Sequence, residues 1–179
     1  MTTLRDFRLE DLFEYTNVTL DVLTEVYTDT FYMYYMSKWP RYFTATEDHQ
    51  KTLTGYMIGK AEGKGEEWHG HISAVTVDPQ FRRLGLARRL IRDLERTSEE
   101  LYDTWFVDLF VRASNKLAIG MYEALGYAIY RTVREYYSAD LLHAAENALD
   151  MRRPCAKDTD KRSLICKKRV VSRDEIRFD

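Results

Sequence analysis

The sequence has few residues that break or cross-link a chain. It contains 3 prolines, 8 glycines and 2 cysteines in 179 residues. The cysteines, Cys155 and Cys166, lie in a polar stretch at a spacing that matches no zinc motif, which argues against a disulfide scaffold or a zinc finger. We therefore expect two free thiols in a reducing compartment.

Long apolar runs and an excess of one charge are also missing. No run approaches the length of a membrane span, and the first residues, with Arg5 and Asp6 among them, do not resemble a signal peptide. The 27 basic residues nearly balance the 29 acidic ones, so no overall field attracts nucleic acid. We expect a cytoplasmic protein that binds neither a membrane nor a nucleic acid directly.

What is present is an ordinary globular composition with 45% hydrophobic residues, enough for one domain with its own core. We expect that domain over residues 1–153 and a polar, loosely ordered tail over 154–179. The patterning predicts strands over 1–7, 41–46, 52–61, 68–77, 105–111, 127–133 and 147–152. It predicts helices over 9–17, 29–39, 86–94 and 115–125, with Asp29 and Asn115 as caps of two of them.

This alternation predicts an α/β (α+β) fold with a central mixed sheet of about seven strands flanked by about four helices. The run 105–111 is almost continuously apolar, as expected for a central strand that is covered on both faces. Gly126 directly follows the last predicted helix, where a C′ residue belongs.

One turn carries a chemical signal. Arg82-x-x-Gly85-x-Ala87 stands between a predicted strand and a predicted helix. A helix N-terminus offers unpaired N–H groups and a positive dipole end, and small residues let phosphate approach the backbone. The alternatives are a nucleic-acid patch made by the arginines around it, or a simply solvated helix face; the placement of Gly85 and Ala87 favours a pyrophosphate site.

Several strings together resemble one family. The turn matches the signature of GCN5-related N-acetyltransferases. The strings 66–71, 82–87, 107–112 and 130–138, in this order, resemble the catalytic subunits of NatB N-terminal acetyltransferases. The resemblance spans about residues 1–153, and we see no counterpart for the tail.

The resemblance implies an enzyme that transfers acetyl from acetyl-CoA to the α-amine of protein N-termini that begin Met-Asp, Met-Glu, Met-Asn or Met-Gln. It also implies a large helical-repeat auxiliary subunit and, through it, attachment to ribosomes. An acetyltransferase for lysine or small amines, and a non-catalytic acyl-CoA-binding subunit, remain the alternatives.

By the same resemblance, acetyl-CoA would be held along one strand, in the turn and at the next helix. The implied residues are Val75, Val77, Arg82, Arg83, Leu84, Gly85, Leu86, Ala87, Arg88, Asn115 and Tyr122. Tyr122 would protonate the departing CoA thiolate, and a thiol pKa near ~8.5 against a tyrosine pKa near ~10 makes that transfer feasible. Asn115 could be only a helix cap, and Tyr122 only a core residue.

The resemblance places Glu25, Tyr27, His71, Tyr136 and Tyr137 along the peptide groove, although the tyrosines could equally be ordinary surface aromatics. The strands that carry a histidine or glutamate base in other acetyltransferases offer Phe110 and no glutamate. Because an α-amine has a pKa near ~8, a weak base could suffice, and Glu25 is our candidate for positioning the amine.

His69 and His71 share a strand face, so a metal site has to be considered. The sequence shows no third ligand nearby, and a His-x-His pair alone is a weak signal. We expect no metal, and we expect His71 to contact the second residue of the substrate.

Overall fold

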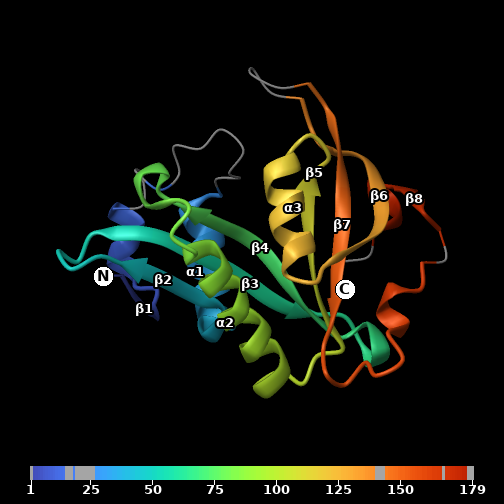
Figure 1. The fold of residues 1–179 in the computed structure, drawn as a ribbon, viewed down its shortest axis with the longest axis horizontal. Coiled ribbons are helices and arrows are strands. Elements are labelled where there is room, and N and C mark those ends of the chain that lie inside the picture. Colours follow the sequence, from blue (N-terminus) through green and yellow to red (C-terminus); the bar gives the residue numbers. More distant parts are fainter. Residues whose placement is uncertain (1, 15–17, 19–26, 140–143, 167, 177–179) are drawn as a thin grey trace. The chain divides into compact units, whose positions relative to one another are not determined.

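The computed structural model describes residues 2–14, 18, 27–139, 144–166 and 168–176. Within them lie eight strands: β1 (Thr3–Asp6), β2 (Phe43–Glu47), β3 (Leu53–Glu62), β4 (His69–Val77), β5 (Phe106–Arg112), β6 (Ala128–Tyr137), β7 (Glu146–Pro154) and β8 (Val170–Ser172). The α-helices are α1 (Asp29–Lys38), α2 (Leu86–Glu100) and α3 (Lys116–Ala124). The strands follow the order β1-β2-β3-β4-β5-β7-β6-β8 in one mixed sheet (Figure 1).

The mixed sheet with its flanking helices confirms the predicted fold class, although the described residues form one strand more and one α-helix fewer than predicted. The sheet has eight strands, because β8 lies in the region predicted to be a loose tail. The predicted helix 9–17 is a 3-10 turn over Leu9–Phe13 in the described residues, and residues 15–17 lie outside them. No helix in the described ranges is long and apolar enough to cross a membrane.

The chain divides into two compact units. The first comprises residues 1–60 and 72–101, and the second comprises residues 61–71 and 102–179. The boundaries cut through β3 and β4, so each of these strands contributes residues to both units.

In the first unit, β2 pairs antiparallel with both β1 and β3. Helix α1 begins after Thr28, whose hydroxyl accepts a hydrogen bond from the Phe31 N–H. Our expectation that Asp29 is the cap is therefore wrong, because Asp29 is already helical and Thr28 supplies the extended backbone of an N-cap. The helix ends before Trp39 and Pro40, as predicted.

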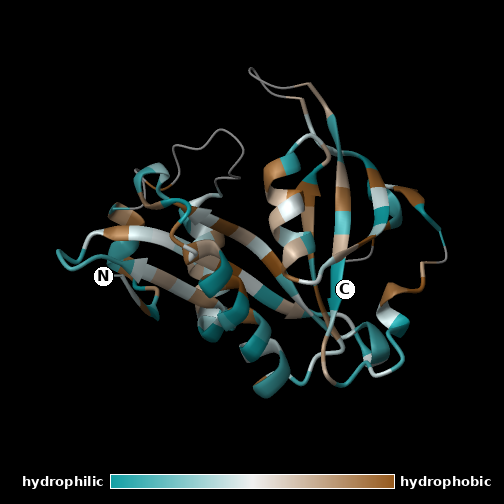
Figure 2. Cartoon of the chain, viewed as in Figure 1, coloured by the Kyte–Doolittle hydropathy of each residue, from teal (hydrophilic) through white to brown (hydrophobic). Residues whose placement is uncertain are grey.

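Helix α2 is amphipathic. Its apolar stripe, Leu86, Leu90, Ile91 and Leu94, is at most 4% exposed. Figure 2 shows its other side as mainly hydrophilic. Burial of this stripe holds the helix in place and so fixes the position of its first turn.

In the second unit, β7 lies between β5 and β6 and pairs antiparallel with both. Strand β8 pairs parallel with β6, and Val133, Ala148, Val171 and Ile176 form a buried cluster there. The expectation of a loosely ordered tail is wrong for this part of it. The reason is that Val171 and Ile176 gain burial only against strands far away in sequence, which the local polar composition does not reveal.

Candidate active site

The turn that follows β4 in the first unit is held by short-range hydrogen bonds. The Asp78 carboxylate accepts from the Gln80 N–H at 2.8 Å, and Arg82 Nε donates to the Val77 carbonyl oxygen at 3.2 Å. The turn therefore keeps a fixed path from the end of the strand to the start of α2. Part of the Arg82 guanidinium serves this structural purpose, in addition to any contact with a ligand.

Gly85 is the N-cap of α2 and has a left-handed backbone with φ of 80°. A Cβ placed on it would meet no atom within 4 Å. The space beside the first turn of α2 is therefore open, and the N–H groups of that turn, which have no partner inside the helix, lie next to it. This is the geometry that an anionic phosphate requires.

The other residues predicted around this turn serve different purposes. Arg83 also has a positive φ of 65°, and Leu84 is 65% exposed. Leu86 is 4% exposed and anchors the helix in the core, while Ala87 and Arg88 complete its first turn. Val75 and Val77 lie on β4 immediately before the turn, and Val77 is buried.

Asn115 and Tyr122 belong to the second unit. The Asn115 side-chain oxygen accepts from the Ala118 N–H at 3.1 Å, so the predicted cap of α3 is confirmed. Its amide nitrogen is not needed for the cap. Tyr122 is 6% exposed, and its ring lies 5.7 Å from the ring of Tyr127. Burial raises the pKa of Tyr122, so the hydroxyl keeps its proton across the physiological range.

Three of the predicted groove residues meet around Phe110. The Phe110 ring lies 4.8 Å from Tyr136 and 5.6 Å from His71. The Tyr137 hydroxyl donates to the Phe110 carbonyl oxygen at 3.2 Å, and its ring lies 5.1 Å from Tyr136. Phe110, which stands on β5 where some acetyltransferases carry a histidine, is therefore the centre of an aromatic cluster.

Tyr27 lies in the first unit, where its hydroxyl donates to the Ser73 carbonyl oxygen of β4 at 3.1 Å. Its ring stacks on Phe31 at 4.1 Å, which fixes the side chain at the start of α1. Glu25, our sequence candidate for positioning the amine, lies outside the described residues.

A buried carboxylate, Asp108, lies behind His71. Its Oδ1 is 2.7 Å from His71 Nδ1 and 3.5 Å from His69 Nε2. His69 in turn lies with Nε2 3.7 Å from Glu62 Oε1, and its ring stacks on Phe106 at 4.7 Å. Both histidines therefore face the same carboxylate, which confirms that they share a strand face.

The charged row continues on the other side of Asp108. Its register partner on β7 is Arg152, whose Nε lies 3.6 Å from Asp150 Oδ1. Asp150 accepts a hydrogen bond from Arg131 Nε at 2.8 Å. The sequence of charges from Glu62 to Arg131 thus alternates in sign. Alternation compensates for the cost of burying each charge.

The pKa directions follow from this row. Burial alone would raise the pKa of Asp108, but the charges of His69 and His71 outweigh burial and lower it. Burial would lower the pKa of His69, yet the Asp108 charge outweighs burial and raises it. Burial raises the pKa of Asp150 to about 6, with a further contribution from Asp108. Asp108 is therefore the permanent anion of the row.

Glu62, His69 and His71 each bring one potential ligand atom within 4.8 Å of the others. The expectation that no third metal-binding side chain is near the His-x-His pair is thus wrong, because the neighbouring strand β3 supplies Glu62. The same side chains also pair with one another, since His69 Nε2 lies 3.7 Å from Glu62 Oε1 and 3.5 Å from Asp108 Oδ1.

Sequence reasoning missed Asp108 and Glu62. The available signal was the isolated charge in Val107-Asp108-Leu109, since an acid inside a buried strand needs partners. The partners of Asp108 could not be identified from the sequence, because Glu62 is 46 positions away and reaches the cluster only through strand pairing.

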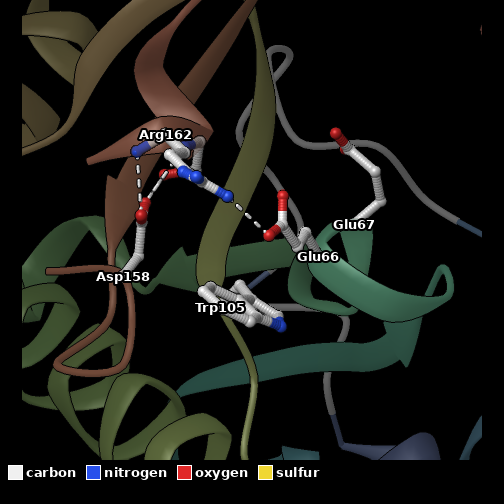
Figure 3. Close-up of a pocket in the computed structure, with 6 residues that line it drawn as sticks. Glu66, Glu67, Trp105, Asp158 and Arg162 are labelled. Atoms are coloured by element: carbon white, nitrogen blue, oxygen red, sulfur yellow. Dashed lines mark hydrogen bonds and ion pairs between the residues drawn. The ribbon is translucent and has the colours of Figure 1, made fainter. Parts of the chain in front are cut away.

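A small cavity of about 50 Å³ also lies in the second unit. Figure 3 shows Arg162 reaching Glu66 while Asp158 points to the Arg162 backbone, with contacts of 2.7 Å and 2.8 Å. The cavity is far below the roughly 300 Å³ of a ligand pocket. It marks the place where the segment after β7 packs against the turn before β4.

Comparison with known proteins supports one assignment. A model of the acetyltransferase (GNAT) family matches residues 7–127. N-alpha-acetyltransferase 20 of Dictyostelium discoideum is 54% identical over 171 residues and covers 96% of each chain. The N-terminal acetyltransferase B complex catalytic subunit NAA20 of Arabidopsis thaliana is 49% identical over 179 residues, with 100% of both chains covered.

A solved structure agrees with these relatives. Chaetomium thermophilum Naa20 in complex with a bisubstrate analogue has a TM-score of 0.87 and 40% identity, and the match covers 95% of this chain and 96% of that one. The Arabidopsis match also includes residues 154–179, so the expectation that the tail has no counterpart is wrong. The chain belongs to the GNAT acetyltransferase family and, within it, to the catalytic subunits of NatB N-terminal acetyltransferases.

Proposed function

We propose that this chain transfers the acetyl group of acetyl-CoA to the α-amine of protein N-termini that begin Met-Asp, Met-Glu, Met-Asn or Met-Gln. The observation that carries the proposal is the open space at Gly85 beside the first turn of α2. A pyrophosphate can accept hydrogen bonds from that turn without meeting a side chain. The solved relative bound to a bisubstrate analogue supports the same reading.

On the donor side, backbone N–H groups from Arg82 to Arg88 would hold the CoA phosphates. The backbone at Val75 and Val77 would bind the pantetheine arm, and an N–H group there would polarise the thioester carbonyl. Asn115 would add a hydrogen bond to the arm through the amide nitrogen that its cap does not use.

On the acceptor side, the family resemblance assigns Glu25, Tyr27, Tyr136 and Tyr137 to contacts with the substrate peptide and its initiating methionine. The tyrosine rings supply apolar surface, and their hydroxyls can bind peptide groups. His71 would contact the second residue, whose side chain always carries an oxygen acceptor in the four preferred sequences.

Tyr122 would act as the general acid. Its raised pKa keeps the hydroxyl protonated but also makes it a weaker acid than the ordinary tyrosine of the sequence argument, so the transfer to the thiolate is less favourable. A buried phenolate without a counter-charge is costly, so the proton that Tyr122 gives to sulfur must be replaced at once. The acetylated nitrogen, which carries one proton too many after attack, can return it.

The proposed partner is a large helical-repeat auxiliary subunit, and through it the ribosome, with the reaction taking place in the cytosol. The relatives support this, since the Arabidopsis one is called the catalytic subunit of a B complex and a solved NatB complex bound to a bisubstrate inhibitor covers 98% of this chain with a TM-score of 0.86.

The proposal is tested by turnover of acetyl-CoA on four peptides. The chain, assembled with its auxiliary subunit, is assayed on peptides that begin Met-Asp, Met-Leu or Ser-Glu and on one with an internal lysine. We expect at least ~10-fold higher kcat/KM for Met-Asp. Turnover of the lysine peptide with none of Met-Asp would contradict the proposal and support a lysine acetyltransferase.

The Tyr122→Phe variant tests the general acid. Removing one hydroxyl should lower kcat by about 10²-fold, the usual range of a lost acid catalyst, and leave KM for acetyl-CoA within a factor of three. Tyr34→Phe is the control, because Tyr34 is 52% exposed on α1. Equal kcat values for the two variants would remove Tyr122 from the mechanism.

A further inference from the structure

Four side chains of the second unit bring together donor atoms that suit one metal ion. Glu62 Oε1 lies 3.7 Å from His69 Nε2, and His69 Nε2 lies 3.5 Å from Asp108 Oδ1. His71 Nδ1 lies 2.7 Å from the same Asp108 oxygen. The four residues come from β3, β4 and β5, which are neighbours in the sheet. Our expectation of no metal rested on a missing third ligand, and Glu62 supplies one.

The spacing of these atoms is close to that of a four-coordinate site. Ligand bonds of about 2.1 Å place the donor atoms of a tetrahedral site roughly 3.4 Å apart. The distances from His69 Nε2 to Glu62 and to Asp108 agree with that value to within about 0.3 Å. Only the hydrogen bond between His71 and Asp108 has to lengthen, by about 0.7 Å, once its proton has left.

His69 already has the orientation of a metal ligand. Its Nδ1 is 2.6 Å from the Glu67 carbonyl oxygen, which can only accept, so Nδ1 carries a hydrogen. Nε2 therefore faces the two carboxylates. A lone pair there would repel both, so a cation has to stand between them, either a proton on Nε2 or a metal ion. Metal-binding histidines commonly donate their other N–H to a backbone carbonyl in this way.

The donor set selects the class of ion. Two carboxylates neutralise a divalent cation while both imidazoles stay neutral. Arg152, the register partner of Asp108, lies 3.6 Å from both Asp150 and Glu67, so other acids balance its charge. Two imidazole nitrogens and two carboxylate oxygens are donors that Zn²⁺ accepts, whereas Mg²⁺ and Ca²⁺ prefer oxygen atoms alone and more of them.

We propose that Glu62, His69, His71 and Asp108 form a binding site for a divalent ion of the zinc class. The ion replaces the protons held between these side chains, so each imidazole that was charged releases one proton on binding. The bound ion holds β3, β4 and β5 together. The Glu62 and His69 side chains are 9% and 13% exposed, which gives the ion access from solvent on their side.

Metal binding is measured on the complex assembled with the auxiliary subunit, after a chelator has removed all metal. Equilibrium dialysis compares Zn²⁺ binding by the wild type, Glu62→Gln and His69→Gln. All complexes contain the same auxiliary subunit, so its own metal sites cancel in the difference. We expect one additional Zn²⁺ in the wild type, and at least ~10-fold weaker binding at this site in each variant, because each loses a ligand.

His49→Gln and Glu10→Gln are the matched controls, since both residues are exposed and lie outside the cluster. Both controls should bind Zn²⁺ as the wild type does. Equal binding by all five complexes would overturn the proposal and show that protons alone hold the cluster.

A second measurement needs no variant. Co²⁺ bound to the wild-type complex should show the strong visible absorption of a four-coordinate ion, with the auxiliary subunit alone as the background, and Zn²⁺ should displace it. Only the weak absorption of six-coordinate Co²⁺ would overturn the proposal, even if Glu62→Gln and His69→Gln fail to fold.

Discussion

Single residues in the second unit fix the position of the charged row. His69 is held from two sides, by the Glu67 carbonyl oxygen at 2.6 Å and by the stacked ring of Phe106. The Glu67 carbonyl belongs to the short turn between β3 and β4. The position of this imidazole therefore depends on the backbone of a turn as much as on its charged neighbours.

Gly63 begins that turn and cannot be replaced without changing it. Its φ is 95°, and a Cβ there would lie 2.0 Å from the Glu67 carbonyl oxygen. Because the clash is with backbone, we expect Gly63→Ala to lower the free energy of unfolding by about 2–4 kcal/mol, as for other strained backbone sites. Urea unfolding monitored by circular dichroism measures this.

Gly120 provides the matched control. It lies inside α3, where a Cβ would meet nothing within 4 Å and φ is ordinary. Gly120→Ala should raise stability by about 0.5–1 kcal/mol through helix propensity. Similar effects of the two substitutions would mean that the turn at Gly63 can relax.

Among the elements, β8 is the one whose role could not be anticipated. It has only three residues, and its hydrogen bonds go to β6, with Thr132 opposite Val170 and Arg134 opposite Ser172. Next to it, the Arg173 guanidinium lies 5.7 Å from the Tyr136 ring. The C-terminal segment thus packs behind a residue that we assign to the peptide groove.

Two neighbouring valines test whether β8 is part of the folded core. Val171 is 5% exposed and Val170 is 40% exposed. Val171→Ala should cost about 1–3 kcal/mol of unfolding free energy through lost burial and a cavity, whereas Val170→Ala should stay within about 0.5 kcal/mol. Thermal unfolding of the two variants measures this difference in stability. Equal midpoints would show that β8 is not packed in solution.

Elements with a strong local pattern could be predicted from the sequence, and those defined by distant pairing could not. The apolar stripe of α2 and the run 105–111 gave a helix and a central strand, as found. Strand β8 has too few residues to show any period. Asp108 could be recognised as unusual, but its partners Glu62 and Arg152 come from strands that only the sheet order brings together.

For the whole molecule, the residues assigned to the proposed function occur in both units. The turn at Gly85 and Tyr27 belong to the first, while His71, Asn115 and Tyr122 belong to the second. Asp150 in the second unit and Glu47 in the first change their contributions to stability in opposite directions as pH falls. The pH dependence of unfolding therefore distinguishes the two contributions.

In the second unit, Asp150 has its pKa raised to about 6, mainly by burial. A carboxyl group with a raised pKa binds its proton more tightly in the folded state. Its contribution to stability therefore increases as pH falls from about 6 towards its ordinary value near 4. Protonation of Asp150 therefore stabilises the folded state between about pH 6 and pH 4.

In the first unit, Glu47 has its pKa lowered to about 2 by hydrogen bonds from Lys51 and Arg5. The Arg5 contact is 2.6 Å and also links β1 to β2. A lowered pKa means that the stabilising contribution of Glu47 is complete above about pH 4.5 and is lost as pH falls towards 2.

Glu47→Gln should therefore lower the unfolding midpoint at pH 7 and make the loss of stability between pH 4.5 and 2 less steep. Glu10→Gln, at an exposed position in the same unit, should leave both unchanged. Thermal unfolding from pH 2 to 7 measures the effect, and parallel curves for Glu47→Gln and the wild type would show that this ion pair does not stabilise the fold.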